Sequence, residues 1–146
     1  MLHDISLVAV FSACLFAGAS LYINVAEQPA RLKLDTNSAA SQWAPSYARA
    51  TWMQAPLAVV SLVCGTTVWL MGVGIGWMVA ALLMGLVVPF TLFAIMPTNR
   101  ALLTRGRDLG SAQTRTLLKR WGRLHAVRTA LSLAATLLYF WLLRGT

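Results

Sequence analysis

The chain has 146 residues, of which 58% are hydrophobic and only 11% are charged. Soluble domains of this size usually carry about a quarter charged residues, so the composition excludes an ordinary soluble enzyme. The net charge of +8 would suit a nucleic-acid-binding protein, but the long apolar runs hold almost none of the basic residues, which indicates a polytopic membrane protein with no nucleic-acid partner.

Four segments are long and apolar enough to cross a bilayer, because a helical crossing takes about 20 apolar residues. The first, residues 5–26, could be taken for a secretory signal. It lacks a basic amino-terminal region, and its apolar stretch is longer than the roughly 7–15 residues of a signal core, so we predict a retained helix. The other predicted spans are residues 52–71, 75–96 and 124–143.

The connections between the spans set the predicted topology. Residues 72–74 separate the second and third spans so closely that these two must form an antiparallel hairpin. The two longer connections, residues 27–51 and 97–123, then share one side of the membrane, and both termini share the other. The long connections hold ten Lys and Arg residues and the opposite side holds only Arg144, so the positive-inside rule predicts cytoplasmic loops and outside termini. We therefore predict an all-α, single-domain, antiparallel four-helix bundle over residues 1–146, in the plasma (inner) membrane.

Residues 41–50, which precede the second span, carry Trp43 and Tyr47 four positions apart. Tryptophan and tyrosine are enriched where a membrane protein meets the headgroup region. The sequence predicts that this segment lies along the membrane interface or caps the bundle from the cytoplasmic side.

Strongly polar residues occur where the predicted spans approach the cytoplasmic side. Such residues are costly in a bilayer, about 2.5–3.5 kcal/mol for an arginine at the middle of a helix. At 100° per residue, most of them continue stripes of small residues that let helices pack closely. They are Asn24 and Glu27 on the first span, Gln54 on the second, Asn99 after the third, and His125 and Arg128 on the fourth. We predict that they meet in one pocket in the cytoplasmic leaflet.

Each of these residues alone has a simpler interpretation. Arg128 lies about one turn inside its span, and its long side chain could snorkel to the interface. Glu27 could be solvated at a frayed helix end, Asn99 could only stop its helix, and His125 could be a structural histidine. The pocket interpretation is favoured because several spans contribute polar groups at one depth.

Counting ligands argues against a metal centre. His3 and His125 are the only histidines, and the predicted topology places them near opposite faces, about 30 Å apart. Neither cysteine lies near His125 in depth. A site made of Asn24, Glu27 and His125 would be poor in ligands, so we expect no metal, although a metal-dependent reaction stays open.

Four stretches of the chain resemble the DUF1772 family of small four-helix membrane proteins, which is related to the anthrone oxygenases. They are NVAEQPARL (24–32), SQWAPSYARATWMQAP (41–56), MPTNRALL (96–103) and RWGRLHAVRTALS (120–132), in the family's order. The most specific parts are the P-T-N after the third span and the R-W-x-x-x-H-x-x-R that opens the fourth.

The resemblance implies oxidation of a lipophilic phenolic, anthrone-like substrate to a quinone by O2, without an organic cofactor. His125 would then be the base, and Arg128 and Asn99 would stabilise the developing oxyanion. Glu27 would orient His125 or neutralise Arg128. Substrate binding would fall to Asn24, Gln54, Trp43, Trp52 and Trp121.

Two other functions are compatible with the same residues. One is a non-catalytic membrane protein that binds a quinone or a lipid headgroup in the same pocket. The other is a small transporter or scaffold that assembles as a homo-oligomer, although the outer half of the predicted bundle has few polar residues to line a path.

Overall fold

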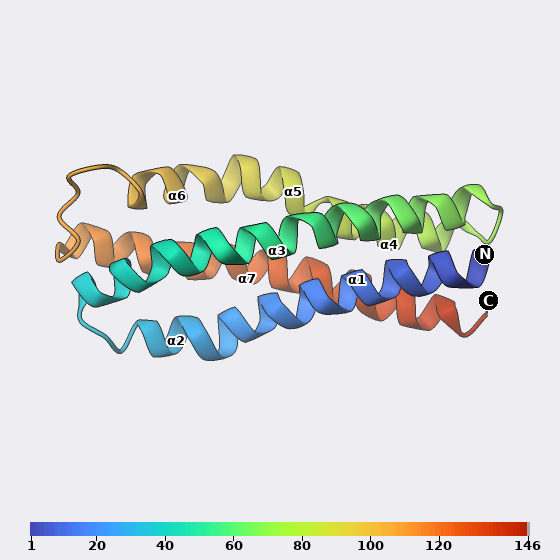
Figure 1. The fold of residues 1–146 in the computed structure, drawn as a ribbon, viewed down its shortest axis with the longest axis horizontal. Coiled ribbons are helices and arrows are strands. Elements are labelled where there is room, and N and C mark those ends of the chain that lie inside the picture. The colour runs from blue at the N-terminus through green and yellow to red at the C-terminus, as the bar shows by residue number, and fades with distance from the viewer. Residues whose placement is uncertain (146) are drawn as a thin grey trace.

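The computed structural model describes residues 1–145, and every regular element in that range is a helix. The helices form columns that are each long and apolar enough to cross a membrane, and within the described range there are four: Leu2–Arg31, Thr36–Leu70, Ile75–Leu102 and Ala112–Leu143. The columns lie side by side, with both termini at one end of the bundle and the connections at residues 32–35 and 103–111 at the other (Figure 1). We call these the terminal end and the loop end. Most of the residues predicted as long loops, 27–51 and 97–123, are therefore helical. The predicted all-α, four-helix membrane bundle is confirmed, and the chain is an integral multi-pass membrane protein.

The first column is built from three helical segments, α1 (Leu2–Tyr22), the π-helical turn η1 (Ile23–Glu27) and α2 (Gln28–Arg31). A π-turn holds one more residue than an α-turn, and such turns are frequent at functional sites. Here the π-turn carries Asn24 and Glu27 toward the loop end of the bundle.

The second column is a single helix, α3 (Thr36–Leu70). Its start is capped by the Asp35 carboxylate, which accepts a hydrogen bond of 3.0 Å from the Ser38 backbone N–H. Hydrogen bonding by Ser38 also lowers the pKa of the Asp35 carboxyl below its ordinary value. Residues 41–50 lie within α3, continuous with the predicted second span, and Trp43 is buried there in the bundle.

The third column is interrupted several times, and the fourth is continuous. The third comprises α4 (Ile75–Gly85), α5 (Val87–Phe90), the π-turn η2 (Thr91–Ile95) and α6 (Met96–Leu102), and the fourth is α7 (Ala112–Leu143). The break between α4 and α5 lies just before Pro89, which cannot donate the backbone hydrogen bond that a continuous helix requires.

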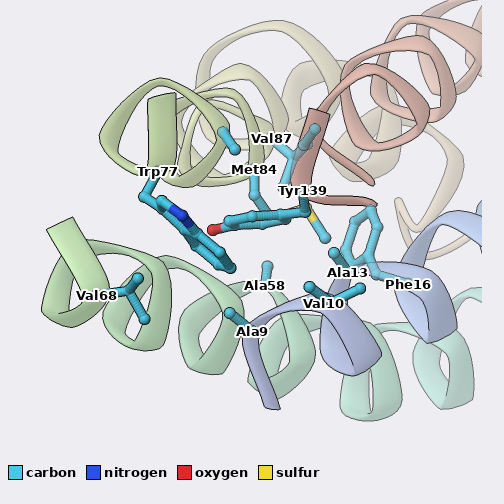
Figure 2. Packing of buried hydrophobic residues seen from close by; sticks show 12 residues of the cluster. Ala9, Val10, Ala13, Phe16, Ala58, Val68, Trp77, Met84, Val87 and Tyr139 are labelled. Carbon is cyan, nitrogen blue, oxygen red and sulfur yellow. The ribbon is translucent and has the colours of Figure 1, made fainter. Parts of the chain in front are cut away.

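Close packing at the terminal end depends on small residues that face inward. The Tyr139 hydroxyl of α7 donates to the Ser61 carbonyl of α3 at 3.1 Å, and the Ser61 hydroxyl donates to the Ala9 carbonyl of α1 at 3.0 Å. Figure 2 shows the rings of Trp77 and Tyr139 next to each other between the helices. Their centroids are 5.4 Å apart. The faces of the helices that continue into the polar residues are buried: Ala13, Ala17 and Ser20 on α1, Ala58, Ser61 and Gly65 on α3, and Ser132, Ala135 and Tyr139 on α7.

A second apolar cluster closes the loop end. Trp43 of α3 and Trp121 of α7 meet edge to face with 5.8 Å between ring centroids, and Trp43 stacks on Tyr47 at 5.1 Å. Ile95 and Leu118 complete the packing around them. The polar residues of the candidate site lie between these two clusters.

Candidate functional site

His125 is held from the first column by Asn24. The imidazole is buried on the inward face of α7, and its Nδ1 lies 2.8 Å from Asn24 Oδ1 on η1. The Asn24 amide is fixed in turn by α7, because its Nδ2 donates to the Gly122 carbonyl at 3.1 Å and its Oδ1 accepts from the Thr129 hydroxyl at 2.5 Å. Asn24, which the resemblance assigned to substrate binding, therefore contacts the His125 imidazole directly.

Arg128 projects from the next turn of α7 toward α3. Its Nη2 donates to Gln54 Oε1 at 2.8 Å, and its guanidinium lies 5.2 Å from the centroid of the Phe16 ring. No ion pair to Arg128 occurs among residues 1–145. The four acidic residues of the chain have other partners: Asp4 pairs with the terminal amine, Glu27 with Arg31, Asp35 with Ser38 and Asp108 with Gly110.

Gln54 and Arg128 line a cavity of about 170 Å³ between α3 and the α5–η2 part of the third column. Apart from these two residues its walls are mainly apolar, with Phe16, Ala58 and Val87 among them. For comparison, an engineered apolar cavity of about 150 Å³ in another protein holds benzene. The space is therefore large enough for one aromatic ring as it stands.

Two further spaces adjoin the cavity, one toward His125 and one on α3. The inner recess, about 10 Å³, is lined by His125 and Trp121 and shares Gln54 and Arg128 with the cavity. An outer groove of about 600 Å³ on α3 shares Tyr47, Thr51 and Ala55 with the cavity. The groove, the cavity and the recess are therefore neighbouring spaces with shared walls.

The structure brings together five of the residues predicted from sequence and leaves others apart. The grouped residues are Asn24, Gln54, Trp121, His125 and Arg128, and the Trp121 and His125 ring centroids are 4.9 Å apart. Trp43 packs behind Trp121 and lines none of the three spaces. Trp52 is 83% exposed and lies in the outer groove, two positions from Gln54 and on the other face of the helix.

Asn99 and Glu27 have surroundings that differ from those expected. Asn99 is buried on α6 and does not line the cavity or the recess, and within the described residues neither atom of its amide has a hydrogen-bond partner. Glu27 accepts from Arg31 and from Ser46, so it neither orients His125 nor neutralises Arg128.

Arg31 is the residue of this region that sequence reasoning missed, because it was counted with the loop residues. Its side chain is buried against the Trp121 ring, 5.8 Å from the ring centroid, and donates to Gln28 Oε1 at 2.5 Å. The Glu27–Arg31 spacing of four residues was the available signal, since such a pair can meet on one helix face.

The described residues offer no ready metal centre. Among residues 1–145, no group of three or more His, Cys, Asp or Glu side chains is placed to hold one ion. The nearest neighbours of His125 are instead an amide, an indole and a guanidinium. These groups can bind and polarise an organic oxygen.

Comparison with known families agrees with this arrangement. A model of the anthrone oxygenase family matches residues 43–138, which is more than half of the chain. The chain belongs to the anthrone oxygenase family. The match includes Gln54, His125 and Arg128, whereas Asn24 and Arg31 precede it. No curated protein and no solved structure matches the chain.

Proposed function

We propose that this membrane protein is an oxygenase that uses O2 to oxidise a lipophilic phenolic, anthrone-like substrate to the corresponding quinone without an organic cofactor. One observation carries the proposal: an imidazole and a guanidinium with no carboxylate partner among residues 1–145 line adjoining spaces, next to an outer groove on α3. The family supplies the reaction type, and this site supplies groups that suit it.

The proposed reaction needs a base and an anion-binding group. The methylene of an anthrone is acidic because its carbanion is an enolate spread over the aromatic rings and the carbonyl oxygen. Removal of one proton gives an electron-rich anion that O2 can oxidise directly. The carbon then loses its second hydrogen as a C=O bond forms. In total the CH2 group gains one oxygen atom, and the other oxygen of O2 leaves with both hydrogens as water.

Three residues have defined parts in this proposal. His125 accepts the methylene proton and returns it to the oxygen that leaves as water. Arg128 and Gln54 bind the enolate oxygen, since both line the cavity and Arg128 has a charge that a neutral amide cannot compensate. Removing one such stabilising group typically lowers kcat by about 10²–10³-fold. In this proposal Gln54 takes the part that the resemblance implied for Asn99, which does not line the cavity.

The second candidate function is binding without chemistry. The same uncompensated Arg128 and the groove on α3 would also suit a quinone or an anionic lipid headgroup. Such a protein would bind a quinone at the cavity but would not consume O2.

The test is O2 uptake by the purified protein in lipid nanodiscs supplied with anthrone, with the quinone product followed by its absorbance. We expect uptake well above that of empty nanodiscs, a loss of at least about 10²-fold in His125→Ala, and full activity in the control His3→Ala. His3 suits the control because it lies in the first turn of α1, at the terminal end. Uptake equal to that of empty nanodiscs, or unchanged in His125→Ala, would refute the enzyme. Quenching of tryptophan fluorescence by a soluble quinone in that case would support the binding protein.

A further inference from the structure

The hydrogen bonds of Asn24 determine which nitrogen of His125 carries the proton. Asn24 Nδ2 lies 3.1 Å from the Gly122 carbonyl oxygen, and only the NH2 side of the amide can donate to that carbonyl. The reversed amide would place two oxygens against each other there. The orientation of the amide therefore follows from α7 itself, and its oxygen faces His125.

An amide oxygen can only accept hydrogen bonds. Because Asn24 Oδ1 lies 2.8 Å from His125 Nδ1, that nitrogen must carry a hydrogen. The Thr129 hydroxyl also reaches Oδ1, and alternatively the Ser20 carbonyl at 3.2 Å, but Oδ1 remains an acceptor for Nδ1 in either case. A neutral imidazole has one N–H, so Nε2 has the free lone pair. A second proton would place a cation one helical turn from Arg128.

We propose that Asn24 is a positioning residue that holds His125 as the Nδ1–H tautomer and so leaves Nε2 as the proton acceptor of the ring. Free histidine in water prefers the Nε2–H form, so the protein selects the tautomer that solution disfavours. Asn24 does this from the π-turn η1, in the part of the chain that precedes the family match. The tautomer stands on geometry alone, while its catalytic consequence rests on the proposed function.

The tautomer is measurable because the chain has only two histidines. In a His3→Gln background, protein labelled with 15N-histidine in nanodiscs gives the two ring nitrogens of His125 alone. We expect a protonated Nδ1 and an unprotonated Nε2 in the 15N spectrum at neutral pH. A protonated Nε2, in the tautomer or in the imidazolium ion, would overturn the proposal.

Variants of the contact distinguish the hydrogen bond from mere packing. Asn24→Leu keeps the size of the side chain and removes the acceptor, so the population should move toward Nε2–H. Asn24→Asp retains an acceptor and should keep Nδ1 protonated. Thr129→Val should keep the wild-type tautomer, since it removes only a second donor to Oδ1. An unchanged spectrum in a folded Asn24→Leu, checked by size-exclusion chromatography, would also overturn the proposal.

The activity assay adds a separate readout. If His125 is the base, Asn24→Leu should lower kcat by about 10–100-fold with little change in KM, and Asn24→Asp should recover part of the loss. A wild-type protein without O2 uptake would refute the oxygenase while the 15N spectrum still decided the tautomer. Full kcat in Asn24→Leu with an altered tautomer would refute the positioning role.

Discussion

Glu27 and Arg31 form an ion pair one helical turn apart, in which the Arg31 side chain is 2% exposed and that of Glu27 is 20% exposed. Gln42 and Ser46 of α3 donate to the same carboxylate oxygen, so the pair ties the end of the first column to the start of the second. Since Arg31 also packs on Trp121, the contact extends to the fourth column and lies directly behind the recess.

We predict that Glu27→Gln destabilises the protein. Breaking a buried ion pair costs about 3–5 kcal/mol because the remaining charge stays buried, and we expect about 3 kcal/mol here because Glu27 keeps some contact with water. Thermal unfolding in detergent measures the change. Asp4→Asn is the matched control, since it removes an exposed pair with the terminal amine, whose members are 84% and 77% exposed. Equal melting temperatures for the two variants would show that the Arg31 charge is compensated in another way.

We predict that adding one methyl group at Gly65 destabilises the protein. A Cβ at this position would lie 2.0 Å from the Tyr139 hydroxyl oxygen and 3.1 Å from Ala81 Cβ. Tyr139 cannot withdraw without losing its hydrogen bond to Ser61, so Gly65→Ala should cost about 1–3 kcal/mol in unfolding free energy. Gly18→Ala, which meets nothing within 4 Å, should be neutral or slightly stabilising.

Adding Tyr139→Phe to Gly65→Ala should recover only part of that loss. The ring atom Cζ would still lie 2.9 Å from the new methyl group. Complete recovery would mean that the hydroxyl alone fills the space between α3 and α7.

Asn99 and Gln54 give opposite predictions, although both are buried amides. Asn99 is 0% exposed and has no hydrogen-bond partner within residues 1–145, and leaving such a group unsatisfied costs about 1–3 kcal/mol. We therefore expect Asn99→Leu to raise the melting temperature and to keep O2 uptake within about twofold of wild type. Gln54→Leu should lose uptake, because Gln54 binds Arg128 and lines the cavity. A stable Asn99→Leu without activity would instead place Asn99 at the substrate.

The positions of individual residues show how far helical periodicity in the sequence predicts this site. Gln54, His125 and Arg128 could be predicted because regular helices and their small-residue stripes fix which face is inward. Trp52, which only the resemblance assigned to the substrate, is 83% exposed in the outer groove, because a position two residues from Gln54 falls on nearly the opposite face of the helix. Helical periodicity also placed Asn24 in the pocket, but it does not identify His125 as its partner, because a stripe gives the inward face of a helix and not the individual contacts.

The orientation of the bundle remains a prediction from charge. The helices α3 and α7 have 35 and 32 residues, more than the roughly 20 that cross the apolar layer, so their loop ends extend into the headgroup region or beyond it. The ten basic residues within residues 27–51 and 97–123 lie toward that end, and we predict that it faces the cytoplasm.

Single cysteines test this orientation in a Cys14→Ser, Cys64→Ser background. Met71→Cys lies in the turn between α3 and α4 at the terminal end, and Thr104→Cys lies in the connection after α6 at the loop end. A maleimide that cannot cross the protein's membrane should label the cysteine at position 71 in intact cells, provided that any outer layer of the cell lets the reagent through. It should label the cysteine at position 104 only after lysis. The reverse pattern would move the polar recess to the outer leaflet. The substrate would then be drawn from the opposite side of the membrane, while the contacts of His125 and Arg128 would stay the same.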